Sequence, residues 1–191
     1  MPAIKRCAWG EQDSMIDYHD KEWGVPVHDD RKLFEMLTLE GAQAGLSWST
    51  ILNRRPGYKK AFANFNIRKV SQYGEKDIEK LMNNTGIIRN RLKIISTIEN
   101  AKKILEIKKE FGSFDKYLWA FVENKPQINK YKSLNKIPAQ TEISDHISND
   151  LKKRGFKFVG PTIIYAFMQA IGMVNDHEVG CFRFKEVQKH Y

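Results

Sequence analysis

The sequence predicts an all-α fold, and three observations support that prediction. Apolar residues recur at intervals of three and four through most of the chain, which is the spacing of amphipathic helices. Almost no segment alternates between polar and apolar residues, and residues 25–27 are too short to count as a strand. The chain has 191 residues, of which 41% are hydrophobic. It can therefore bury a core over residues 1–191, either as a single domain or as two small lobes around a cleft.

The composition excludes several classes of protein. No run of about 18 apolar residues is present, so we expect no membrane-spanning helix. The first residues, MPAIKRCAWGEQ, lack the apolar centre of a signal peptide. Two cysteines, Cys7 and Cys181, argue against a secreted disulfide scaffold. We therefore expect a cytoplasmic protein.

The charge balance points to a partner. Lysine and arginine total 32 against 23 acidic residues, which gives a net charge of +9. This excess favours a polyanion, nucleic acid first. The alternative is a generally basic protein that uses its charge only to stay dissolved.

The first 31 residues are rich in aromatic and turn residues and show little regular periodicity. Trp9, Tyr18 and Trp23 are many aromatic side chains for a loop, so they either close the edge of the core or line a site. Asp29 or Asp30 can cap the helix that follows.

The stretch KLFEMLTLEGAQAGLSW, residues 32–48, predicts a helix with an acid on its apolar face. Glu40 falls on the same side as the inward residues Leu33, Met36, Leu37 and Ala44. A buried carboxylate is costly unless something pairs with it. Gly41 and Gly45 loosen the end of the helix, and Trp48 follows. An acid beside an indole suits a pocket for a flat polar ring; the alternative is a glutamate at the core edge, bonded to a backbone amide.

Further helices are predicted along the rest of the chain. They cover residues 47–62 with an interruption at Pro56-Gly57, 70–83, 87–111 with Leu92 in its apolar stripe, 113–122, 144–154 and 162–171. Residues 123–140 are polar and turn-prone, and we expect a loop there that separates the two lobes.

The segment KKRGFKFVGPT, residues 152–162, predicts a tight turn between two helices. Gly155 is a typical helix-stop residue, Gly160 permits close backbone approach, and Pro161 suits the first position of the next helix. The unpaired amides of that helix start, beside several cations, suit a phosphate group. The cations are Lys152, Lys153, Arg154 and Lys157. The alternative is an ordinary interhelical turn with solvated lysines.

Two cysteines and two histidines near the chain ends have the composition of a tetrahedral zinc site. His177 and Cys181 are four residues apart, so on a helical turn they face the same way. Cys7 and His19 would complete the set and join the termini. A disulfide between the cysteines, or two free thiols, are the alternatives. His28, His146 and His190 have no evident partners, and we expect them at the surface.

Together these residues resemble the bacterial DNA-3-methyladenine glycosylase I family, within the helix–hairpin–helix glycosylases. The similarity extends over essentially the whole chain. It is carried by CAWG (7–10), YHDKEWG (18–24), LFEMLTLEGAQAGLSW (33–48), GIIRNRLKI (86–94), LKKRGFKFVGPT (151–162) and VNDHEVGC (174–181).

The resemblance implies an enzyme of base-excision repair that hydrolyses the N-glycosidic bond of 3-methyladenine in alkylated double-stranded DNA and releases the free base. It implies a two-lobed helical fold with the hairpin near residues 148–171. It also implies one structural Zn²⁺, held by Cys7, His19, His177 and Cys181 in a lobe that both termini build. We further expect a monomer.

The resemblance also assigns residues to the base and to the DNA. The acidic residue of the active site is Glu40, which selects the cationic base by charge and hydrogen bonding and is not a nucleophile. The flipped base is received by Tyr18 and Trp48, with Trp9 and Trp23 close by. The segment that fills the gap in the duplex contains Gln43, Gly45 and Leu46. The hairpin that anchors the DNA contains Gly155, Lys157, Gly160 and Thr162.

The wider superfamily keeps a catalytic aspartate after the hairpin, and bifunctional members add a lysine nucleophile. Asp176 occupies the corresponding region, but its place beside His177 favours a turn or capping role. No lyase lysine is evident, so we expect a monofunctional enzyme. Two rival functions remain at this point: a glycosylase for another lesion, such as 7-methylguanine or 8-oxoguanine, and a basic helical DNA-binding module without activity.

Overall fold

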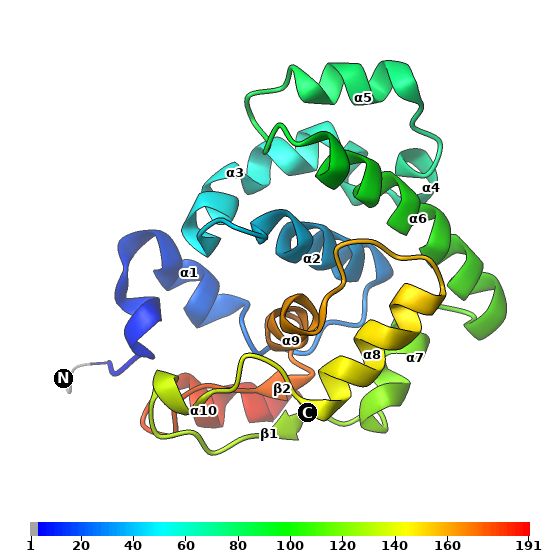
Figure 1. Ribbon diagram of the computed structural model, residues 1–191. Coiled ribbons are helices and arrows are strands. Elements are labelled where there is room, and N and C mark those ends of the chain that lie inside the picture. The colour runs from blue at the N-terminus through cyan, green and yellow to red at the C-terminus, as the bar shows by residue number, and fades with distance from the viewer. Residues whose placement is uncertain (1–3) are drawn as a thin grey trace.

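The computed structural model describes residues 4–191; residues 1–3, which the predicted domain included, lie outside the described residues. The prediction of a helical fold is confirmed in its main feature (Figure 1). The α-helices are α1 (Asp13–Lys21), α2 (Asp30–Gln43), α3 (Trp48–Ala61), α4 (Ile67–Val70), α5 (Glu75–Met82), α6 (Arg91–Phe111), α7 (Phe114–Trp119), α8 (Glu142–Lys153), α9 (Pro161–Ala170) and α10 (Arg183–Glu186). The 3₁₀ turns are η1 (Ala8–Glu11), η2 (Ala63–Phe65), η3 (Ala120–Val122), η4 (Leu134–Lys136) and η5 (Val187–His190).

Helix α2 is the centre of the fold. Every residue from Leu33 to Ala42 is buried, so the helix is enclosed on all sides and not on the one face that its spacing predicted. It packs against α3, α6, α7 and α9. Helices α3 to α6 lie on one side of it, and α1, α10 and the chain ends lie on the other (Figure 1). Asp29 caps α2 by accepting a hydrogen bond from the backbone of Lys32, as predicted.

A cluster of ion pairs fixes α1, α2 and α3 relative to one another. Arg55 of α3 donates to both carboxylate oxygens of Glu22, at 2.8 and 2.7 Å, and to Glu35 of α2 at 2.6 Å. Lys32 adds a bond to Glu22 at 2.9 Å. These charge-assisted bonds are short and directional, so they set the distances between the three helices.

Two parallel strands are an exception to the all-α prediction. β1 (Gln127–Ile128) pairs with β2 (Val174–Asn175). Two residues per strand are too few for a periodic pattern, so the sequence could not predict them. The pairing holds the loop at 123–140 against the segment that follows α9.

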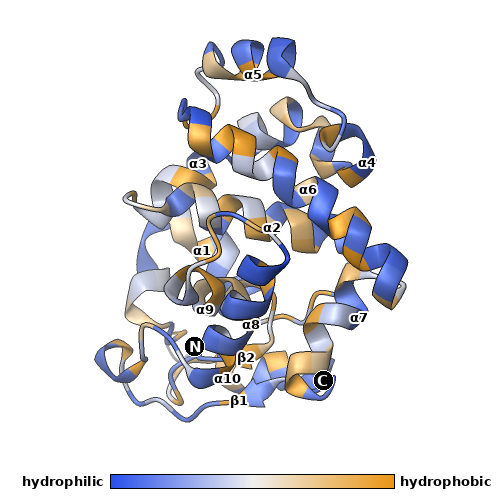
Figure 2. Cartoon of the chain, turned by 45° about the vertical axis from the view of Figure 1, so that its right-hand side comes forward, coloured by the Kyte–Doolittle hydropathy of each residue, from blue (hydrophilic) through white to orange (hydrophobic). Residues whose placement is uncertain are grey.

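Several helix boundaries differ from the prediction. The N-terminal region, where the sequence showed little periodicity, forms the regular elements η1 and α1. Helix α3 continues through Pro56, and Gly57 serves close packing: a Cβ there would lie 2.1 Å from the carbonyl oxygen of Gly86. Helix α6 begins only at Arg91, and Leu92, predicted to face the core, is 68% exposed. Along α6, hydrophobic and hydrophilic residues are interspersed (Figure 2).

None of the described helices combines the length and the apolar composition of a membrane span.

Candidate active site

A cavity of about 400 Å³ lies between α1, α2, the start of α3 and α9. Seven of the predicted site residues line it: Trp9, Tyr18, Trp23, Glu40, Gln43, Trp48 and Thr162. The remaining wall comes from Tyr165 and Gln169 of α9 and from residues 134–139, which follow the strand β1. The structure therefore brings all five residues of the predicted base pocket together.

Glu40 is the acid of this cavity. Its side chain is 4% exposed, and within residues 4–191 it has no ion pair and no side-chain hydrogen bond. The structure therefore does not support the alternative of a glutamate bonded to a backbone amide. Burial raises the pKa of Glu40 to about 8. A cationic ligand would lower that pKa again, because it stabilises the carboxylate.

Aromatic rings form the walls around Glu40. The ring centres of Tyr18 and Trp48 are 5.4 Å apart, and those of Trp9 and Trp23 are 4.9 Å apart in an edge-to-face arrangement. The indole Nε1 of Trp48 is buried and has no hydrogen-bond partner within the described residues. Burial and the nearby charge of Glu40 raise the pKa of Tyr18 well above its ordinary value, so its hydroxyl stays protonated. These walls suit a flat, electron-poor ring.

The turn after α2 carries the predicted gap-filling residues. Gly45 has a φ of +78°, and Leu46 is 40% exposed. Lys93 of α6 donates to the carbonyl oxygens of Ala42 and Ala44, at 2.8 and 2.7 Å. A cation bonded to the last carbonyls of a helix stabilises that helix end. Lys93 thus fixes the turn, a role that the sequence analysis did not predict.

The hairpin between α8 and α9 has the predicted form. Gly155 has a φ of +90°, and Pro161 begins α9. Asn100 of α6 accepts from the backbone amide of Lys157 and donates to its carbonyl oxygen, both at 2.9 Å. A Cβ at Gly160 would meet nothing within 4 Å, so a larger side chain there would not strain the protein itself. The same helix, α6, therefore holds both the turn after α2 and the hairpin.

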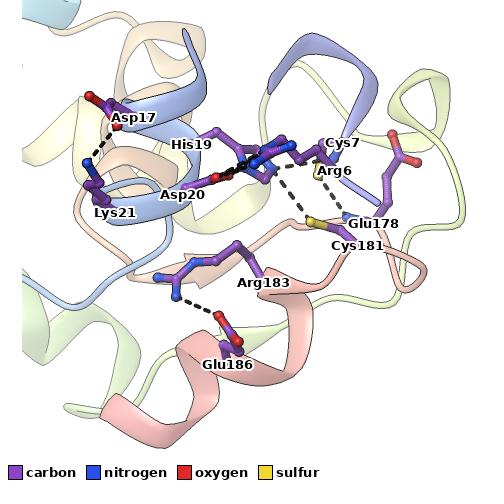
Figure 3. A network of polar contacts seen from close by, with 10 residues as sticks. All are labelled: Arg6, Cys7, Asp17, His19, Asp20, Lys21, Glu178, Cys181, Arg183 and Glu186. Atoms are coloured by element: carbon purple, nitrogen blue, oxygen red, sulfur yellow. Dashed lines mark hydrogen bonds and ion pairs between the residues drawn. The ribbon is translucent and has the colours of Figure 1, made fainter. Parts of the chain in front are cut away.

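Cys7, His19 and Cys181 form a buried cluster in which the possible ligand atoms all lie within 4.8 Å of one another (Figure 3). Both cysteines are free thiols and not a disulfide. The Nδ1 of His19 pairs with Asp20 at 2.7 Å, and Asp20 also accepts from Arg6. A carboxylate on the far nitrogen of an imidazole is the usual partner of a metal-ligating histidine.

His177, the fourth predicted ligand, falls outside this tight group, although its ring lies 5.1 Å from that of His19. It lies in a turn, not on a helix as its spacing from Cys181 suggested. Its Nδ1 pairs with Asn175, and its Nε2 is buried without a partner. Burial lowers the pKa of His177 to about 3, and the hydrogen bond from Cys7 lowers the pKa of Cys181 to about 4. Two thiols and two imidazoles are the donors of a tetrahedral zinc site, and the buried Nε2 of His177 without a partner fits a metal ion beside this cluster.

The chain was compared with known proteins. The family model for methyladenine glycosylases matches residues 8–184. The chain belongs to this family. DNA-3-methyladenine glycosylase 1 of Escherichia coli (strain K12) is 50% identical over 179 residues, which cover 93% of this chain and 96% of that protein.

Solved structures of this glycosylase family agree with the fold. A crystal structure of 3-methyladenine DNA glycosylase I is 51% identical, covers 93% of this chain and 98% of its own, and has a TM-score of 0.90. A second crystal structure, a variant enzyme in complex with 3-methyladenine, is 36% identical, covers 94% of this chain and 97% of its own, and has a TM-score of 0.90. Membership of this enzyme family favours the catalytic prediction over a DNA-binding module without activity.

The structure differs from the prediction at several residues. Asp176 is not a turn or cap: it is fully buried and accepts hydrogen bonds from Asn129, Tyr165 and Gln169. The sequence analysis also missed Tyr165 and Gln169, although with Thr162 they lie at helical spacing on one face of α9. His28 pairs with Asp115, where no partner was expected.

The unpaired state of Glu40 predicts how stability depends on pH. Glu40→Gln should gain stability over the wild type as pH rises, because folding must keep a proton that the unfolded chain releases. The difference in the free energy of unfolding should be small near about pH 4 and grow until about pH 8, by up to roughly 1.4 kcal/mol per unit. Urea denaturation across this range measures it.

Glu35→Gln is the matched control, since Glu35 is equally buried on the same helix but pairs with Arg55. It should lose stability at neutral pH, because Arg55 loses a partner. A difference for Glu40→Gln that does not change with pH would contradict the assignment of an unpaired carboxyl.

Proposed function

We propose that this protein excises 3-methyladenine from alkylated double-stranded DNA as a monofunctional, monomeric glycosylase of one domain. The observation that carries the proposal is an unpaired, buried Glu40 that lines one cavity with Tyr18 and Trp48, in a chain of the methyladenine glycosylase family. Excision of a base requires that the nucleotide leave the duplex and enter a pocket. The cavity of about 400 Å³ is large enough for a purine.

The chemistry follows from the charge of the lesion. Methylation at N3 leaves the attached adenine cationic, so the base is a good leaving group without protonation. When the bond from C1′ to the base nitrogen breaks, its electron pair neutralises the ring; water adds at C1′ and releases a proton to solvent. Glu40 holds the cationic base by accepting hydrogen bonds, while the adjoining rings of Tyr18 and Trp48 offer it an aromatic surface. Selectivity then comes from binding, and little acid catalysis is needed.

Two elements bind the DNA in this proposal. The hairpin with Gly155, Lys157, Gly160 and Thr162 presents the N-terminus of α9 to a phosphate. The turn with Gln43, Gly45 and Leu46 fills the gap left by the extruded nucleotide. The exposure of Leu46 and the open space at Gly45 and Gly160 support these roles.

A structural Zn²⁺ would be held by Cys7, His19, His177 and Cys181. Four protein ligands leave no open position, so the ion would support folding and not catalysis. It would join the N-terminal segment to the C-terminal turn, in a lobe built from both chain ends. The orphaned Nε2 of His177 and the carboxylate on His19 support this assignment.

We expect one tightly bound zinc ion per chain. Cys181→Ser should lower the melting temperature by several degrees, because removing a ligand weakens a metal site that contributes to folding. The ratio of excision rates between two lesions should change far less. Elemental analysis of protein purified without chelators measures the ion, and finding no metal would overturn the assignment.

We expect DNA affinity to fall linearly with the logarithm of salt concentration, because bound phosphates release counterions. Lys157→Ala should reduce that slope by about one contact. Gly160→Val should weaken binding more, by keeping the backbone away from phosphate. Titration of abasic-site DNA at several salt concentrations measures both effects, and unchanged affinity for Gly160→Val would exclude the hairpin from the interface.

We expect Glu40→Gln to weaken binding of free 3-methyladenine and to slow excision without abolishing it. A hydrogen bond to a carboxylate contributes roughly 1.5–3 kcal/mol where a neutral one contributes about 1. Single-turnover excision and abasic-DNA affinity are measured side by side, and the second should not change. Wild-type excision would make Glu40 structural, whereas complete loss with intact base binding would place it in the chemical step.

A further inference from the structure

A buried carboxylate lies behind the cavity and fixes two of its walls. Asp176 is 0% exposed. Its Oδ2 accepts from the hydroxyl of Tyr165 at 2.6 Å and from the Nε2 of Gln169 at 2.7 Å, and its Oδ1 accepts from Asn129 at 2.7 Å. Tyr165 and Gln169 line the cavity, whereas Asp176 and Asn129 do not. Both carboxyl oxygens of Asp176 are thus bonded, and Asp176 holds Tyr165 and Gln169 in place.

The bond to Asp176 determines which end of the Gln169 amide a ligand can meet. The Oδ2 of Asp176 acts as an acceptor for both Tyr165 and Gln169, so the NH₂ group of Gln169 must face it. The amide cannot turn over, because its carbonyl oxygen would then face the carboxylate. The backbone is also held, since the carbonyl oxygen of Gln169 accepts from the amide of Gly24 at 3.0 Å. Gln169 lines the cavity, and its side-chain Oε1 has no hydrogen bond within residues 4–191, so this atom is free to accept from a ligand.

Glu40 differs from Gln169 in this respect. Because burial raises its pKa to about 8, Glu40 carries a proton at neutral pH and can donate as well as accept. A base with a carbonyl oxygen could therefore still bond to Glu40. The amide of Gln169 has only one protonation state, so its Oε1 can accept a hydrogen bond but cannot donate one.

We propose that Gln169 is a specificity-determining residue, whose Oε1, oriented by Asp176, accepts from the 6-amino group of a flipped purine and repels a 6-oxo group. This inference rests on the proposed function. The pocket would then present two acceptors to the 6-substituent: Glu40, which can change its protonation, and Gln169, which cannot. A 6-oxo purine would leave two acceptor oxygens facing each other in a buried site.

The sharpest comparison is between two lesions that share the methyl group and the charge. In 3-methyladenine and 3-methylguanine the methylated ring is cationic while attached to the sugar, so both bases leave readily. They differ at position 6, amino against oxo, and at position 2. DNA treated with a methylating agent carries both, and chromatography of the freed bases gives the ratio of their single-turnover excision rates.

Gln169→Met keeps the length of the side chain but removes the acceptor, and Gln169→Leu is a second variant of different shape. Asn129→Ala is the matched control, because it also takes one donor from Asp176 but leaves the Gln169 bond in place. We expect both Gln169 variants to lower the ratio of 3-methyladenine to 3-methylguanine excision by about tenfold, the equivalent of one lost hydrogen bond in a buried site. Asn129→Ala should leave the ratio at the wild-type value.

Either of two results would overturn the inference. One is an unchanged ratio in both Gln169 variants. The other is an equal fall in Asn129→Ala, which would mean that the ratio follows the packing around Asp176 and not the acceptor. Failure of the wild type to free 3-methyladenine would instead refute the proposed function, and this inference with it, so the two failures are distinguishable. Metal content and melting temperature of each variant show that the comparison is between folded proteins.

Discussion

The fold depends on α2, which is enclosed along its length and carries two buried glutamates in opposite states. Glu35 and Glu40 are 5% and 4% exposed. Glu35 pairs with Arg55 at 2.6 Å and lies within ion-pair distance of Lys32 and Lys59. Glu40 has no such partner among the described residues. Burying a carboxyl without compensation is unfavourable, so the contrast on one helix supports the proposal that Glu40 binds a ligand.

The ion pairs of Glu35 help to position the helices around Glu40. Because Arg55 bonds to Glu22 and Glu35 together, it fixes the end of α1 and the middle of α3 against α2. Tyr18 is on α1 and Trp48 begins α3, so the same ion pairs set the distance of both rings from Glu40. Strong interactions are thus placed around the cavity and omitted inside it. Such an arrangement keeps a binding site rigid while its polar groups stay available.

The sequence predicted the parts of the site that local patterns determine. Helical spacing placed Glu40 inward, Asp29 was a recognisable cap, and Gly155 with Pro161 marked the hairpin. The role of Asp176 could not be predicted in this way, because its donors come from positions 129, 165 and 169 and meet only in the folded protein. Leu92 had the right spacing for the core, but it lies in the first turn of α6, on a side of the helix that is 68% exposed at this residue. The two-residue strands carry no pattern at all.

The proposed metal site is linked to the cavity by contacts between rings. The ring centres of Trp23 and His177 are 4.6 Å apart, and those of Trp9 and His19 are 5.1 Å apart, both in an edge-to-face arrangement. The same two indoles line the cavity and contact each other. An ion that holds the imidazoles would therefore also hold the outer wall of the pocket, without touching the base. This gives the chain ends a reason to meet beside the cavity, because the N-terminal segment supplies aromatic rings to its wall. The proposed metal and the proposed selection of the base would then be coupled only through the rigidity of that wall, because the ion would contact neither of the two proposed acceptors, Glu40 and Gln169.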